Sequence, residues 1–282
     1  MSEVRFSIQH SEFAIHQGIA MPDEGRYLYC IIEEPQPKTF GPLGMGGFGD
    51  ELVSVSYKEL ACVVSHSLIM EYPVTREHTM AHHQAIERIM QEYAVLPVRF
   101  STIAKSDEEI IEKVLKPRYE EFKRLLAWIS GKDAIEVRAS WINMETTFQE
   151  LAEGSPSVQV LKAKIEAKTA AATYYDRIEL GKLVEARLKD KRRDTADQIL
   201  SALKPHACEF RDNSEKLYAE HSICSLAFLV EEDHTMTFDH AVAQLRAASN
   251  GRSKVKVNHR VAPFDFVTIT IQLSEVSDVP AR

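Results

Sequence analysis

Three histidines, His78, His82 and His83, lie close together in a segment of helical periodicity and could bring metal chemistry to this chain. His78 and His82 are four residues apart, a spacing that places two imidazoles on one helix face within reach of one metal ion. A site needs a third ligand, and the residues between them contain no glutamate of an H-E-x-x-H motif. We therefore expect a packed His82 and solvated His78 and His83. A metal-dependent enzyme using His78 and His82 remains an alternative.

Gly44, Gly46 and Gly49 spell G-x-G-x-x-G, which can hold a pyrophosphate where it leads into a helix. Here it leads into residues 51–57, whose pattern predicts a strand, so no helix N-terminus would face a phosphate. Residues 35–49 contain three prolines and five glycines and must form a loop. We predict a flexible loop whose apolar side chains pack on a neighbour or bind a partner protein. These side chains are Phe40, Leu43, Met45 and Phe48.

The remaining chemistry-bearing residues form no catalytic pattern. No G-x-S-x-G nucleophile motif occurs. The four cysteines contain no C-x-x-C pair, and each lies in an apolar stretch, which favours small buried hydrophobes over ligands or nucleophiles. We predict a protein that is not an enzyme, with no catalytic residues, no cofactor and no metal. The cysteines are Cys30, Cys62, Cys208 and Cys224.

Composition and charge argue against two classes of binding partner, nucleic acid and membrane. The chain has 282 residues and a formal net charge of -8, which does not favour a nucleic-acid backbone. The basic stretch 182–193 also carries apolar residues at helical spacing, so it indicates an amphipathic helix with a solvated charged face and a possible protein-docking surface. No apolar run approaches the roughly 20 residues that span a bilayer, and the first ten residues are polar and charged. We expect a cytosolic protein that binds neither nucleic acid nor membrane.

The first half of the chain alternates strand and helix patterns. Ser106 followed by Glu109 predicts a capping box, and Pro117 predicts a kink or break in the helix that it opens. The expected elements are a buried strand 27–33, a hairpin 52–57 and 61–67, a helix 75–93, a strand 94–100 and a helix from 106 to about 129.

The second half has the element order of a ferredoxin-like unit with an enlarged first helical segment and an extra final strand. The expected elements are strand 134–141, helices within 156–203, strands 208–212 and 222–230, helix 238–248, and strands 254–258 and 266–273. We predict an α/β (α+β) protein with an N-terminal mixed α/β domain, residues 1–131, and a C-terminal modified ferredoxin-like domain, residues 132–273. Residues 274–282 would be a flexible tail.

Several stretches resemble one known family in colinear order from Arg26 to Gln272. They are YLYCIIE from Tyr27, ELACVVS from Glu59, AHHQAIERIMQEYAVLPVRFSTI from Ala81, DRIELGKLVEARL from Asp176, SLAFLVEEDHTMTFDHAVAQL from Ser225 and APFDFVTI from Ala262. Together they are similar to the gas vesicle protein F and L family, the F and L types alike. His82 occupies the position of the family's helix histidine, and Ser101 replaces its usual glycine. An N-terminal extension and the Gly- and Pro-rich loop also depart from the family pattern.

The resemblance implies a gas vesicle assembly or accessory protein that binds the small hydrophobic major shell protein, located at the gas vesicle and in the cytoplasm. It also implies a non-ferredoxin α/β N-terminal domain and a modified ferredoxin-like C-terminal domain. An adaptor that binds other gas vesicle accessory proteins is the alternative. We expect the apolar loop and the exposed side of the interdomain helices to supply the contact patches, and Arg99 to pair with a buried acceptor.

Overall fold

The computed structural model describes residues 23–45, 51–217, 219–271 and 273. The chain divides into two compact units. Unit 1 comprises residues 1–130 and 262–282, and unit 2 comprises residues 131–261. The mixture of helices and antiparallel sheets agrees with the predicted α+β class.

Unit 1 is built on a six-stranded sheet of order β2-β3-β4-β1-β5, with β6 also pairing with β1. All of these pairings are antiparallel. The strands are β1 (Glu24–Glu33), β2 (Thr39–Gly41), β3 (Leu52–Tyr57), β4 (Leu60–Leu68), β5 (Leu96–Pro97) and β6 (Ile103–Ala104). The predicted hairpin of residues 52–67 is therefore present, whereas the strand predicted over 94–100 is limited to two residues.

The central strand β1 is buried on both faces. Its apolar run from Tyr27 to Ile32 has no exposed surface. The pairing with β4 shifts register between Leu28 and Cys30, so the strand carries a bulge there. As a result Tyr29 and Cys30 both belong to one core cluster, whereas Leu28 and Ile31 belong to the cluster on the other face.

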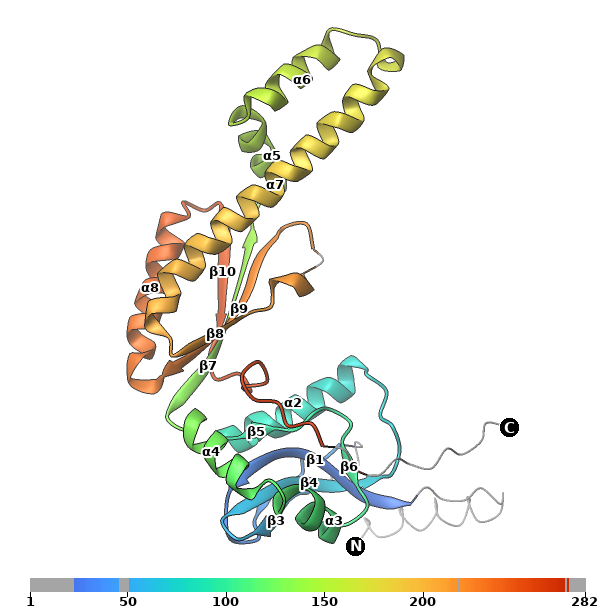
Figure 1. Ribbon diagram of the computed structural model, residues 1–282, viewed down its shortest axis with the longest axis vertical. Helices are drawn as coiled ribbons and strands as arrows, with labels where there is room; N and C mark the ends of the chain where they lie inside the picture. The colour runs from blue at the N-terminus through green and yellow to red at the C-terminus, as the bar shows by residue number, and fades with distance from the viewer. Residues whose placement is uncertain (1–22, 46–50, 218, 272, 274–282) are drawn as a thin grey trace, which may run out of the picture. The chain divides into compact units, whose positions relative to one another are not determined.

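Helices cover each face of this sheet (Figure 1). Helix α2 (Arg76–Met90) packs its apolar stripe on the face that holds the β1 tyrosines, and Thr75 caps it by accepting the His78 N–H. The opposite face is covered by α3 (Asp107–Ile110), the π-helical turn η1 (Ile111–Leu115) and α4 (Tyr119–Ile129). The Ser106 cap is present, and the helix breaks around Pro117 as predicted, because proline cannot donate the hydrogen bond that would continue it.

The segment from Ala262 onward returns to unit 1, which corrects the predicted domain boundary at residue 273. Ile269 exchanges backbone hydrogen bonds with Pro97 and Arg99, and Val267 and Ile269 are buried in the α3–α4 side of the core. The final strand predicted for residues 266–273 is reduced to one isolated bridge between Val98 and Ile269. The predicted tail, residues 274–282, lies outside the described residues.

Unit 2 has a four-stranded antiparallel sheet of order β10-β7-β9-β8. The strands are β7 (Lys132–Trp141), β8 (Glu209–Asp212), β9 (Ser222–Glu231) and β10 (Ser253–Asn258). In chain order the sheet therefore runs fourth, first, third, second, which is the ferredoxin-like arrangement.

Two helices, α7 (Tyr174–Leu203) and α8 (Thr235–Ala248), pack on this sheet through Leu188, Ile199, Phe238 and Val242. The connection from β7 to α7 also contains α5 (Met144–Glu153), α6 (Pro156–Glu166) and the 3-10 turn η2 (Ala170–Thr173). Sequence analysis missed α5. Three further 3-10 turns are η3 (Lys204–His206), η4 (Ser214–Lys216) and η5 (Glu232–His234).

Candidate functional site

The Gly- and Pro-rich loop places part of its apolar surface in the core of unit 1. Phe40 and Met45 are buried at 4% and 1% exposure, and the Met45 N–H donates to the Tyr29 hydroxyl at 2.5 Å. Leu43 is 39% exposed, and Phe48 lies outside the described residues. Phe40 and Met45 are thus unavailable to a partner in this arrangement, and a partner contact through the loop stays a prediction for Leu43.

The glycine pattern in the same loop leads into β3, as the sequence indicated. Gly46 and Gly49 lie outside the described residues. A strand offers no row of free N–H groups of the kind that a helix N-terminus aims at a phosphate. The structure therefore gives no support to nucleotide binding here.

His82 lies at the centre of an aromatic cluster between α2 and the sheet. Its Nδ1 is 3.1 Å from the Tyr27 hydroxyl, which also accepts the Ser101 N–H at 3.0 Å. The Tyr27 hydroxyl and Nδ1 of a neutral His82 ring therefore share a hydrogen bond whose direction depends on which ring nitrogen carries the proton. His82 is 1% exposed, and burial, with a smaller effect of the nearby His83, lowers its pKa from 6.5 to about 4.

The rings around His82 come from distant parts of the chain. Tyr29 stacks on it with ring centroids 5.7 Å apart, Phe100 meets it edge-on at 5.7 Å, and Phe264 lies 6.2 Å away. Ser101 turns the chain with a positive φ of 62°, a backbone conformation that favours glycine. The family's glycine at this position, and its histidine at His82, thus have a structural explanation in one packed cluster.

The two histidines considered as a metal pair do not form a site. His78 Nδ1 is 3.0 Å from the Pro73 carbonyl oxygen, and His82 Nδ1 is engaged by Tyr27. Among the described residues, the one group of three side chains able to share an ion is Glu231, Asp233 and His234, in unit 2. The alternative of a metal-dependent enzyme at His78 and His82 therefore lacks a third ligand within the part of the chain described.

The expectation for Arg99 was wrong. Its side chain is exposed rather than paired in the core, although its backbone N–H donates to the Ile269 carbonyl at 3.1 Å. The resemblance to the family at Pro97 and Val98 has a structural reason, because both residues are buried. The Val98 N–H also donates to the Tyr29 carbonyl oxygen. An exposed arginine needs no buried acceptor.

A helical arm formed by α6 and the first half of α7 is the most prominent surface feature of unit 2 (Figure 1). Asp176 ties its two helices together by accepting hydrogen bonds from Lys164 and Lys168 at 2.9 and 3.1 Å. Four large hydrophobic side chains are nevertheless exposed on this arm. They are Val160 at 70%, Tyr174 at 64%, Tyr175 at 82% and Ile178 at 42%.

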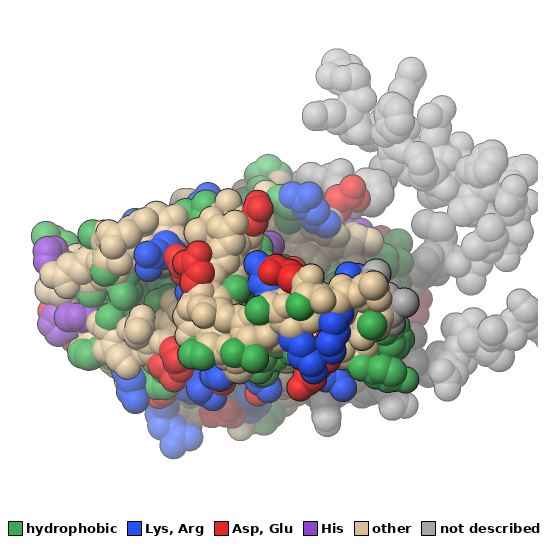
Figure 2. All heavy atoms as spheres, turned by 90° about the horizontal axis from the view of Figure 1, so that it is seen from above, with side chains coloured by type: hydrophobic (Ala, Val, Ile, Leu, Met, Phe, Trp, Pro, Cys, Tyr) green, Lys and Arg blue, Asp and Glu red, His purple; other side chains and the backbone are tan. Residues whose placement is uncertain are grey.

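The basic stretch of α7 is only partly available for binding. Lys191 pairs with Glu150 at 2.7 Å, and Arg192 donates to the carbonyls of Glu220 and Ser222 and lies over the Trp141 ring. On the face in Figure 2, hydrophobic side chains of the described residues occur in small groups separated by basic and acidic ones.

Comparison with known proteins agrees with this fold. Residues 25–268 match the family described as gas vesicle synthesis protein GvpL/GvpF. Gas vesicle protein F of a Nostoc species is 23% identical over 87% of this chain and 99% of its own length. Gas vesicle protein F of a Streptomyces species is 29% identical over 86% of this chain and 98% of its own length.

A solved structure shares the architecture. The crystal structure of the gas vesicle protein GvpF from an Anabaena species aligns with a TM-score of 0.75 at 21% identity, over 90% of this chain and all of that chain. No described helix is long and apolar enough to cross a lipid bilayer. The family match covers most of the chain and both units, so this protein belongs to the GvpL/GvpF family of gas vesicle synthesis proteins and has a gas vesicle-related role.

Proposed function

We propose that this chain is an assembly or accessory protein that binds the major gas vesicle shell protein and assists formation of the shell. A small hydrophobic shell subunit must expose apolar surface before it is incorporated, and such surface aggregates unless it is covered. A family member with an exposed apolar contact surface could cover it and deliver the subunit to the growing shell. The protein would act at the gas vesicle and in the cytoplasm.

The observation that carries the proposal is the tyrosine pair on the arm. Tyr174 and Tyr175 have ring centroids 5.4 Å apart and are largely exposed at the start of α7. Burial of such rings in a core would be the ordinary outcome of folding, whereas exposed aromatic side chains are enriched at protein interfaces. Ile178 lies one turn further along α7 and extends the same apolar surface.

Co-expression with the major shell protein, followed by affinity capture at moderate and high salt, tests this function. Capture that survives high salt is expected, since apolar contacts are not screened by ions. The double variant Tyr174→Ala/Tyr175→Ala should reduce capture about tenfold or more, because tyrosine is enriched among the few interface residues whose truncation costs about 2 kcal/mol or more. Met236→Ala, at an 82% exposed methionine of α8, is the matched control.

Two further outcomes decide between surfaces and partners. Unchanged capture by the double tyrosine variant, with loss in Leu43→Ser, would assign the contact to the loop instead of the arm. Absence of wild-type capture at either salt concentration would refute shell-protein binding and leave the adaptor for other gas vesicle accessory proteins as the function to test.

A further inference from the structure

The solvent-facing side of α7 presents apolar and charged side chains in one row. Ile178, Lys182, Glu185 and Lys189 follow one another at spacings of four, three and four residues, which places them on one side of the helix, the α7 face. All four are exposed, and Ile178 leaves 42% of its surface to solvent. Tyr175, one turn before Ile178, is 82% exposed. Such a row can pack against another helix.

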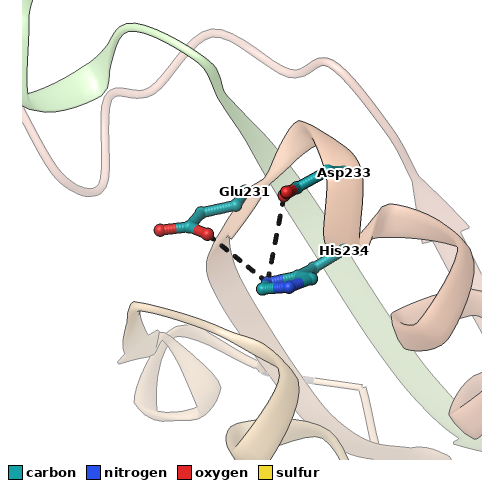
Figure 3. Close-up of side chains that lie close together, drawn as sticks. All are labelled: Glu231, Asp233 and His234. Carbon is teal, nitrogen blue, oxygen red and sulfur yellow. Dashed lines mark ion pairs between the residues drawn. The ribbon is translucent and has the colours of Figure 1, made fainter.

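The charges at the middle of the α7 face are not paired within the chain. The side chains of Lys182 and Glu185 make no ion pair or hydrogen bond with any residue that the structure describes. Other exposed charges of unit 2 do have partners. Figure 3 shows His234 within ion-pair distance of Glu231 and Asp233. Lys182 and Glu185 are therefore open to groups of opposite charge on another molecule.

The α7 face is complementary to itself when a second copy of the helix is turned end to end. A two-fold axis midway between Lys182 and Glu185 makes the two helices antiparallel and sets each residue opposite the one equally far from the axis. Lys182 of each copy then lies opposite Glu185 of the other, so the ion pair forms twice. Ile178 lies opposite Lys189, whose aliphatic stem can cover it.

The same axis brings two small residues together beside the ion pairs. Gly181 of one copy lies opposite Ala186 of the other, and both residues are exposed. A Cβ added to Gly181 would meet no atom within 4 Å, so packing inside the chain does not require glycine there. Glycine is also among the least favourable residues in a helix interior. Close approach of a second backbone gives this glycine a physical reason.

We propose that the α7 face pairs with the α7 face of a second copy of this chain, antiparallel, through Lys182 and Glu185. Charge favours a second copy over an unlike protein, because the face carries both the cation and the anion that its partner needs, at positions that the two-fold axis exchanges. One helix on one helix is a small interface, so the dimer is in exchange with the monomer. The inference does not rest on the proposed function.

The test measures the mass of the full-length protein in solution. Sedimentation equilibrium is run at protein concentrations from about 1 to about 200 µM, because a weak dimer forms by mass action. The weight-average mass should rise with concentration from the monomer value of 32.0 kDa toward twice that value.

Single charge reversals should break the pairing. Lys182→Glu places two carboxylates opposite each other twice, and Glu185→Lys does the same with two ammonium groups. Each should weaken dimerisation about tenfold or more, because like charges across an interface repel. Lys162→Glu, at an exposed lysine of α6, makes the same change in net charge away from the α7 face and should dimerise as the wild type does.

Mixing the two single variants tests the symmetry directly. A Lys182→Glu copy and a Glu185→Lys copy present opposite charges to each other at both positions, so an equal mixture should dimerise although each variant alone does not. Gly181→Leu has room for its side chain in the monomer but keeps two backbones apart, so it should also lose the dimer about tenfold or more. Circular dichroism checks that each variant is folded.

A mass that stays at 32.0 kDa over the whole concentration range refutes the proposal. Single reversals that dimerise like the Lys162→Glu control, a mixture that stays monomeric, or a Gly181→Leu dimer as tight as the wild type would each overturn it as well. The readout is mass and not capture of the shell protein, so these results leave the proposed function untouched.

Discussion

Acid should weaken unit 1 through His82, and the size of this effect follows from its burial. The pKa of His82 is lowered from 6.5 to about 4 because burial disfavours the charged ring, with a smaller contribution from His83. Between these two values the unfolded chain binds a proton that the folded chain does not. Stability is therefore complete above pH 6.5 and declines as the pH falls toward 4.

The two pKa values determine the magnitude. Full protonation of the buried ring corresponds to about 3 kcal/mol, and the loss between pH 8 and pH 5 is about 2 kcal/mol. The side chain is 1% exposed, so solvent screening requires little discount. His82→Gln removes the titration but keeps an amide group able to hydrogen-bond to the Tyr27 hydroxyl, and its free energy of unfolding should lose this part of the pH dependence.

Urea unfolding from pH 5 to pH 8 measures the difference. The chain has two tryptophans, Trp128 in unit 1 and Trp141 in unit 2, so a Trp141→Phe background leaves a fluorescence signal from unit 1 alone. His240→Gln, an exposed histidine of α8, serves as the control. If wild type and His82→Gln show the same slope of unfolding free energy against pH, the ring is not buried in its neutral form and the argument is refuted.

Three further predictions concern packing, backbone strain and thiol access. Gly25→Ala would place a Cβ 2.5 Å from the Ala104 carbonyl oxygen and should destabilise the protein by about 1–3 kcal/mol in urea unfolding. Gly181→Ala adds a Cβ that meets no neighbouring residue within 4 Å, so it should stabilise α7 by about 1 kcal/mol. Equal effects would contradict the packing beside β6. Ser101 has a positive φ, and its hydroxyl accepts the Tyr72 N–H. Both Ser101→Ala and Ser101→Gly remove that hydroxyl, so the backbone strain alone should make the alanine variant about 1 kcal/mol less stable than the glycine variant in urea unfolding. Equal stabilities would show that the strain is absent. Burial raises the pKa of Cys224 to about 12 and also raises that of Cys30 and Cys62. A thiol reagent should therefore modify one cysteine in the native protein, the exposed Cys208, and four after unfolding, and rapid reaction of more than one native thiol would contradict this burial.

Local patterns in the sequence were sufficient for most of the regular elements. Apolar periodicity predicted α2, the hairpin of β3 and β4 and the element order of unit 2, because each signal arises within a few turns or one strand. The Ser106 cap and the break at Pro117 were predictable because capping and proline sterics act within one helical turn. The packed position of His82 followed from its place on the apolar face of α2.

Features that depend on long-range packing were decided by the tertiary structure alone. A glycine- and proline-rich sequence shows that residues 35–49 form a loop, but whether Phe40 and Met45 face a partner or the core depends on the sheet beneath them. The return of Val267 and Ile269 to unit 1 is a pairing with β-structure about 170 residues earlier, which no local periodicity records. Sequence therefore determined most of the helices and strands and which family the chain belongs to, whereas three-dimensional packing decided which apolar side chains remain exposed and which are buried.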